Sequence, residues 1–245
     1  MGANAQIKVP AFTAGQVLTA AEMTQVNTGI PVFATTVTRD AAFDGAGEKV
    51  LAEGQFAYIE ATDTTQYYNG SAWVAVGAAG LTFIAASGVQ TAQANIALNN
   101  CFSSTYKNYR IIVEGMNQSV GANLTMRLRV GGTDTSGSSY YNQRAEVVSS
   151  SVGGVSLTGV SYWSPSYCAT STDGVSFAMD VFRPFDAAGT TATSIGARTD
   201  STTSLYSVFG SFYQSGATSF DGFNFVPASG TISVNNIRVY GYSNS

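Results

Sequence analysis

The sequence predicts a mainly β protein that combines a short N-terminal helix, a β-hairpin collar and a C-terminal antiparallel β-sandwich. Charged residues make up only 11% of the chain, against about 25% in an average globular protein. Aromatic residues reach 12%, and Gly occurs 26 times. After residue 80, runs rich in Val, Ile, Tyr, Phe and Thr alternate with clusters of Gly, Ser and Asn, which is the pattern of short strands joined by turns.

Residues 1 to 36 are predicted to form an extended arm followed by one short helix. Thr19 and Glu22 have the spacing of a capping box, in which each side chain satisfies a free backbone N–H at the helix start. Gly29 and Pro31 are expected to end this helix. A helix of about nine residues does not persist alone in water, so it must dock either on another protein or on the chain's own β domain. The apolar residues available for docking are Phe12, Val17, Leu18, Met23 and Val26.

Residues 37 to 76 are predicted to form the β-hairpin collar. The segments 56–59 and 66–68 have strand character, and Asn69-Gly70 is the signal for a tight type I′ turn. Two strands alone provide no second layer, so the hairpin cannot bury its aromatic side chains without a partner. We therefore expect oligomerisation with another copy of the chain through Phe56, Tyr58, Tyr67, Tyr68 and Trp73.

Residues 77 to 80 are small and predict a flexible joint. Beyond it, residues 81 to 245 contain many short strand candidates, a number that fits a two-sheet, jelly-roll-like sandwich. These candidates are 81–86, 92–98, 109–115, 123–130, 140–148, 155–162, 175–182, 191–198, 205–213, 220–226 and 231–242.

Three of the strand candidates allow a prediction about their faces. In 124–130 the even positions are apolar, so Arg127 and Arg129 are expected to form a solvated outer face rather than a ligand site. The segment 205–213 has apolar residues on both parities, which is typical of a central strand covered on both sides. In the last candidate the apolar residues change from even-numbered to odd-numbered positions across Asn235-Asn236, which predicts a β-bulge.

Composition and motifs exclude several classes of function. The net charge of −4 and the absence of a basic cluster argue against nucleic-acid binding. No run approaches the roughly 18 apolar residues of a membrane helix, so no membrane insertion is expected. The first residues lack the layout of a signal peptide, which predicts synthesis and assembly in a cytosol. Cys101 and Cys168 are expected to be free, buried thiols.

Catalysis is not expected, because the chain has no histidine and therefore lacks the usual general base and nucleophile pairs. No catalytic residue, metal site or cofactor is predicted. Two alternatives stay open: carboxylates that converge for glycoside cleavage and a calcium ion held by loop oxygens. The carboxylates concerned are Asp173, Asp180, Asp186, Asp200 and Asp221.

A candidate receptor-binding segment lies at residues 161–167, where aromatic rings are mixed with Ser and Pro. Glycan recognition uses aromatic faces and hydroxyl or amide groups with little formal charge. Tyr162, Trp163 and Tyr167 are therefore placed on a receptor-facing surface. In the alternative interpretation, these three side chains close the end of the sandwich or a subunit interface.

Several motifs carry a resemblance to a known group of proteins. Residues 39–43 (RDAAF), 53–58 (EGQFAY) and 67–73 (YYNGSAW) resemble a cassette common in tail-fibre, spike and head-fibre proteins of tailed bacteriophages. Residues 12–31 are similar to the N-terminal stretch of many phage appendage proteins, although Thr24 stands where that pattern often has Asn. An ordinary soluble protein with a small hairpin is the alternative.

The C-terminal part resembles the same group. The stretches 102–111 (FSSTYKNYRI), 220–223 (FDGF) and 230–242 resemble signatures of a C-terminal β-sandwich in phage tail and fibre proteins. Residues 131 to 218 resemble these phage proteins only in their general composition and not in a motif.

The resemblance implies a structural component of a phage virion, namely a short homotrimeric tail fibre or spike. Residues 1 to 36 would then bind other virion proteins, and the sandwich would contact a glycan or protein of the host surface. A capsid head fibre, decoration or cement protein is the alternative, because the N-terminal motif occurs in both settings.

Overall fold

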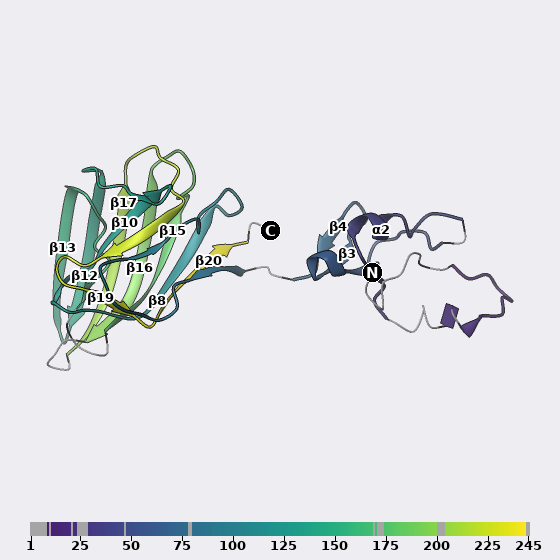
Figure 1. The fold of residues 1–245 in the computed structure, drawn as a ribbon, viewed down its shortest axis with the longest axis horizontal. Helices are drawn as coiled ribbons and strands as arrows, with labels where there is room; N and C mark the ends of the chain where they lie inside the picture. The colour runs from purple at the N-terminus through teal and green to yellow at the C-terminus, as the bar shows by residue number, and fades with distance from the viewer. Residues whose placement is uncertain are drawn as a thin grey trace. The chain divides into compact units, whose positions relative to one another are not determined.

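The structure is a computed structural model that describes residues 9, 11–20, 22–23, 29–46, 48–77, 80–168, 170, 174–199 and 204–243. The chain divides into two compact units, Met1–Ala78 and Ala79–Ser245, which are coloured purple to blue and blue to yellow in Figure 1. The boundary falls within the predicted joint at 77–80. Within the described part, no helix has both the length and the apolar character needed to cross a membrane.

The N-terminal unit contains a four-stranded sheet in the order β1-β2-β3-β4. Strand β1 pairs in parallel with β2, and the other pairs are antiparallel. A short 3₁₀ helix, Glu60–Thr62, joins β2 to β3. The strands are β1 (Val32–Phe33), β2 (Phe56–Ile59), β3 (Thr64–Tyr68) and β4 (Trp73–Ala75). The predicted hairpin is therefore part of a larger sheet.

A helix that the sequence analysis missed packs on one side of this sheet. Helix α2 (Thr36–Asp40) begins with a capping box in which Thr35 and Thr38 bond each other's backbone N–H. Its Arg39 is buried, bonds Asp40 and Gln66, and lies 4.6 Å from the ring centre of Trp73. The small core of this unit consists of Val9, Phe33, Ala42, Phe43, Ala57 and Ile59.

The capping box predicted at residue 19 is confirmed. The backbone N–H of Thr19 donates to Glu22 Oε2 at 2.7 Å, and that of Glu22 donates to Thr19 Oγ1 at 3.3 Å. Met23 N–H donates to Thr19 O at 3.0 Å, as in the first turn of an α-helix. Gly29 has a φ of +74°, a conformation typical of a residue that follows a helix. Residues 24–28 lie outside the described residues.

The turn between β3 and β4 differs from the prediction. Only Gly70 of the Asn69-Gly70 pair has positive φ (+92°), whereas a type I′ turn needs positive φ at both residues. The loop is longer, because Tyr68 pairs with Trp73. Asn69 Oδ1 accepts from the N–H groups of Ser71 and Ala72 at 3.0 and 2.8 Å, so its side chain organises the loop.

The C-terminal unit is an antiparallel β-sandwich built from two principal sheets. The larger sheet has the order β13-β12-β17-β16-β15-β8-β19-β6, and β20 extends it by pairing with β8 and β5. Its strands, several of which lie side by side in Figure 1, are β5 (Leu81–Ala86), β6 (Gln90–Gln93), β8 (Asn108–Gln118), β12 (Tyr140–Val148), β13 (Ser151–Val160), β15 (Val175–Phe182), β16 (Thr190–Thr199), β17 (Leu205–Gln214), β19 (Ile232–Val234) and β20 (Asn236–Tyr242).

The smaller sheet has the order β11-β10-β18-β7, and a separate pair joins β14 to β9. The strands are β7 (Ile96–Leu98), β9 (Ala122–Asn123), β10 (Thr125–Val130), β11 (Thr133–Asp134), β14 (Tyr167–Cys168) and β18 (Gly222–Val226). The predicted strand 92–98 is thus divided between the two sheets.

The core of this unit lies between the two sheets. Phe177 on β15 and Phe225 on β18 meet edge to face with ring centres 6.1 Å apart. On β10, Met126 and Leu128 are fully buried, as the predicted alternation requires, but Thr125 is also buried and Val130 is 43% exposed at the end of the strand. Arg127 and Arg129 lie on the other face and approach Asp134 at 3.9 and 2.9 Å, so the outer face carries ion pairs and is only partly exposed.

The last strand does not contain the predicted β-bulge opposite β8, although its buried side chains do change from even-numbered to odd-numbered positions. Ile232 and Val234 are buried before the break, and Ile237 and Val239 are buried after it. The pairing with β8 keeps one register across the break. Strand β8 also changes its buried parity, at Gly115, which has a φ of +59°. Both strands therefore shift their faces together, and neither has an extra residue opposite the other.

Both cysteines are buried and free, as predicted. Burial raises the pKa of the Cys101 and Cys168 thiols from 9.0 to about 12. Below pH 9 both the folded and the unfolded chain keep these protons. Between pH 9 and 12 only the unfolded chain releases them, so the free energy of unfolding falls as the pH rises.

We expect the wild-type sandwich to lose roughly 1 kcal/mol per thiol between pH 7 and pH 10. Urea unfolding at the two pH values measures the loss. The double variant Cys101→Ala/Cys168→Ala is the control, because its remaining pH dependence belongs to other groups. An equal loss in the variant and the wild type would contradict the assignment.

Candidate binding surfaces

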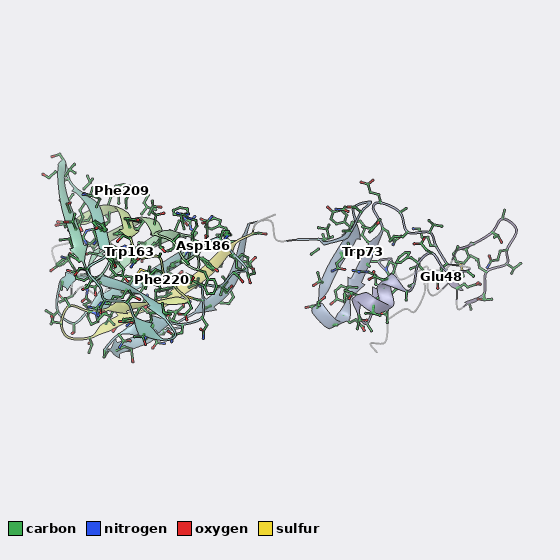
Figure 2. The ribbon with its side chains drawn as sticks, turned by 90° about the horizontal axis from the view of Figure 1, so that it is seen from above. Glu48, Trp73, Trp163, Asp186, Phe209 and Phe220 are labelled. Atoms are coloured by element: carbon green, nitrogen blue, oxygen red, sulfur yellow. The ribbon has the colours of Figure 1, made fainter. Side chains whose placement is uncertain are left out.

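The structure does not place the three predicted receptor-binding residues on a common surface. Trp163 is fully buried, and Tyr162 and Tyr167 are half-buried. In Figure 2, Trp163 and Phe220 both lie within the outline of the sandwich unit, whereas Phe209 lies towards its margin. The prediction of a receptor-facing Trp163 is therefore wrong, because a side chain with no exposed surface cannot contact a receptor.

The segment 161–168 closes the sandwich between its sheets, in keeping with the alternative interpretation. Trp163 forms a β-bridge with Met126, with hydrogen bonds of 2.8 and 2.9 Å. Its indole Nε1–H donates to Tyr213 O at 3.2 Å, which ties the segment to β17 of the larger sheet. Its ring packs edge to face on Tyr140 and at a tilt on Phe212. The backbone of Trp163 therefore contacts the smaller sheet and its side chain contacts the larger sheet, so this one residue connects both.

A group of charged residues lies under the same segment. Glu146 forms ion pairs with two arginines: its Oε1 lies 3.1 Å from Arg144 Nε, and its Oε2 accepts a hydrogen bond of 2.6 Å from Arg198 Nη2. Arg144 also donates to Ser164 O at 3.0 Å. Burial lowers the pKa of Arg144, and the Glu146 carboxylate opposes that shift. Because these side chains bond one another and the covering segment, they act as a buried structural network.

The outer face of the larger sheet is exposed, contrary to the prediction for 205–213. Burial alternates strictly along β17 from Val208 to Gln214, and the outward side chains include Phe209 at 45% and Tyr213 at 42% exposure. Val208 and Phe212 point into the core. The sequence did contain a signal for this alternation, because Ser207 and Ser211 occupy the same face of the strand as Phe209. Apolar residues on both faces obscured that signal.

Two hollows lie next to each other on this outer face. The larger, of about 570 Å³, is lined by residues that include Val152, Gly153, Thr193 and Phe209. The smaller, of about 280 Å³, is lined by residues that include Tyr141, Leu157, Thr158 and Tyr213. Gln143 and Ser211 line both hollows. The two hollows are therefore continuous, and we call the combined depression the outer groove.

The outer groove has aromatic rings at both ends and polar groups between them. Tyr141 and Tyr213 are directly paired across β12 and β17, with ring centres 5.8 Å apart. Gln143 pairs with Ser211, and Ser211 pairs with Thr193 of β16. These residues were missed by sequence reasoning, because only the pairing of distant strands brings them together.

The collar residues are divided between two faces of the N-terminal sheet. Phe56 pairs with Tyr67, and Tyr67 pairs with Val74, which places these three side chains on the outer face together with Tyr58. Phe56 and Val74 are exposed by 42% and 37%.

Trp73 and Tyr68 lie on the opposite face, with ring centres 5.7 Å apart. Trp73 also packs on Phe43 at 5.8 Å. The prediction that Trp73 needs another copy of the chain is therefore wrong. The reason is that α2 and the residues after it supply the second layer that a lone hairpin lacks.

The predicted docking residues near the N-terminus are exposed where the structure describes them. Phe12, Val17, Leu18 and Met23 are 40%, 89%, 38% and 53% exposed, and Val26 lies outside the described residues. None of these four side chains is part of the core of its unit.

The candidate carboxylates do not gather where they are described. Asp180 bonds Tyr242 at 2.6 Å, Asp186 pairs with Lys107 at 2.9 Å, and Asp221 accepts from the N–H of Gly131 at 2.7 Å. Asp173 and Asp200 lie outside the described residues. Within the described ranges, no three His, Cys, Asp or Glu side chains lie close enough together to hold a metal ion.

No family model matches the chain, and no curated protein or solved structure matches it either.

Proposed function

We propose that this chain is a structural component of a bacteriophage virion, a short homotrimeric tail fibre or spike with a jelly-roll-like distal sandwich. In this proposal residues 1 to 36 bind other virion proteins, and the collar joins sister copies. The sandwich then contacts a glycan or protein of the host surface. The motifs at both ends of the chain support the virion location, and the two-sheet core supports the sandwich assignment.

The observation that carries the proposal is an apolar face of the N-terminal sheet that the described residues leave partly exposed. Phe56, Tyr67 and Val74 form a continuous row across three strands. The described core beneath that sheet contains only six buried apolar residues. A core of a unit this small rarely supplies more than about 3–5 kcal/mol, and oligomerisation is a common remedy. Pairing of this face with sister copies would supply the missing burial.

We expect the full-length protein to have three times the mass of its 25.5 kDa chain in solution. The double variant Phe56→Ser/Tyr67→Ser should lower the mass to that of one chain, because it removes the apolar row. Light scattering coupled to size-exclusion chromatography measures both. The matched control is Val37→Ser/Val50→Ser, which changes two residues that are 75% and 72% exposed outside this sheet. A monomeric wild type, or a trimeric face variant, would contradict the collar assignment.

Imaging of intact particles tests the virion location. A gold label on the C-terminus should appear at the tail or baseplate. Labels distributed over the capsid would favour the head-fibre or decoration alternative. Particles without any label, from cells that produce the tagged protein, would remove the virion proposal.

A further inference from the structure

We propose that the outer groove binds a short, uncharged oligosaccharide, with Tyr141, Tyr213 and Phe209 as stacking platforms and Gln143, Ser211 and Thr193 as hydrogen-bonding groups. This inference rests on the proposed function, since it identifies the surface and the ligand class through which the sandwich would contact a host.

The first argument is the chemistry of the lining. Sugar rings present apolar C–H faces that pack on aromatic rings, and hydroxyl groups that bond amides and hydroxyls. The outer groove offers both kinds of group. Tyr141, Phe209 and Tyr213 are each 39–45% exposed, so part of each ring is accessible to a ligand. Gln143 and Ser211 are exposed at the point where the two hollows meet.

The second argument is the spacing of the platforms. Tyr213 and Phe209 lie four residues apart on β17 and point to the same side. At roughly 3.4 Å per residue, the two platforms are about 14 Å apart along the strand. A ligand that stacks at both ends must be elongated, with polar groups at its middle. A short oligosaccharide fits this description better than a single sugar.

The third argument is the charge of the groove. The only formally charged residue in the described lining of the groove is Arg144. The Arg144 side chain is only 3% exposed, and its guanidinium bonds Glu146 and Ser164 on the core side of the sheet. No opposite charge therefore faces a ligand, and an acidic sugar would lose hydration without compensation. The groove thus favours uncharged over acidic saccharides.

The test uses the full-length protein on an array of neutral and acidic trisaccharides, followed by calorimetric titration of the strongest neutral binder. We expect binding to neutral members and none to acidic ones. Tyr213→Ser, and separately Tyr141→Ser/Phe209→Ser, should weaken that binding about tenfold or more. The matched control is Phe83→Ser, which removes a 58% exposed aromatic ring from β5, a distant edge of the same sheet, and should bind as the wild type does. Circular dichroism melting of each variant confirms that it is folded.

The proposal would be overturned by no binding to any neutral trisaccharide, by preference for acidic ones, or by equal loss of binding in the Phe83→Ser control. A Tyr213→Ser chain of reduced oligomeric mass would also overturn it, because a second copy would then cover the groove. A trimer that binds no sugar refutes only this inference. A monomer that binds neutral sugars refutes only the oligomeric part of the proposed function.

Discussion

Replacing Trp163 with alanine is expected to lower the free energy of unfolding of the sandwich unit by about 3–5 kcal/mol, the usual cost of truncating a buried aromatic side chain. Trp163 is fully buried and contacts Tyr140 and Phe212. The substitution leaves a cavity between the sheets and also removes the bond from Nε1 to Tyr213 O. Because natural domains are stable by only about 5–15 kcal/mol, this loss is a large share of the total.

Urea unfolding monitored by far-ultraviolet circular dichroism measures the effect of Trp163→Ala. This signal does not depend on tryptophan fluorescence, which the substitution itself changes. Phe83→Ala is the control, since Phe83 is 58% exposed and its loss should cost far less. If Trp163→Ala unfolds at the same urea concentration as the wild type, then the side chain is not in the core.

The second large effect is expected for Glu146→Gln, which should cost about 3 kcal/mol of stability. Glutamine has the size of glutamate but no charge, so Arg144 and Arg198 would lose the carboxylate that pairs with both. The two arginine side chains are 3% and 8% exposed, and water cannot replace the lost partner. Leaving buried charges without compensation is much more costly than weakening a pair at the surface.

Glu114→Gln provides a matched control for this prediction. Glu114 pairs with Arg238 on the same sheet, but the two side chains are 39% and 38% exposed. Exposed ion pairs contribute about 0–1 kcal/mol, so the same change of charge should have little effect there. Urea midpoints of the two variants and the wild type allow a direct comparison. Equal losses from the two substitutions would mean that burial does not determine the strength of the Glu146 network.

Local patterns in the sequence were sufficient to find most strands. Residues 124–130 alternate apolar and polar side chains, and the structure buries Met126 and Leu128 as expected. Thr19 and Glu22 likewise indicated the start of a helix, because a capping box involves only neighbouring residues. Helix α2 was missed because it has five residues and no apolar period, although Thr35 and Thr38 form a comparable cap.

The candidate site was placed on the wrong residues because exposure depends on which strands pair. Tyr162, Trp163 and Tyr167 look like a surface cluster in the sequence, but the bridge to Met126 places Trp163 between the sheets. Tyr141 and Tyr213 are separated by 72 positions (213 − 141), and nothing local to either residue shows that they face each other. Their pairing follows from the register of β12 with β17.

Composition and short-range spacing establish a β-rich chain with few charges, no histidine, a capped N-terminal helix start and two cysteines whose spacing matches no disulfide framework. These properties depend on residue types and near neighbours, so they can be recognised without coordinates. Whether an aromatic ring is enclosed or exposed depends instead on the long-range pairing of strands and on what covers each sheet. For this reason Trp163 became a core residue and Trp73 packs against the core of its own unit, whereas Phe209 and Tyr213 remained exposed.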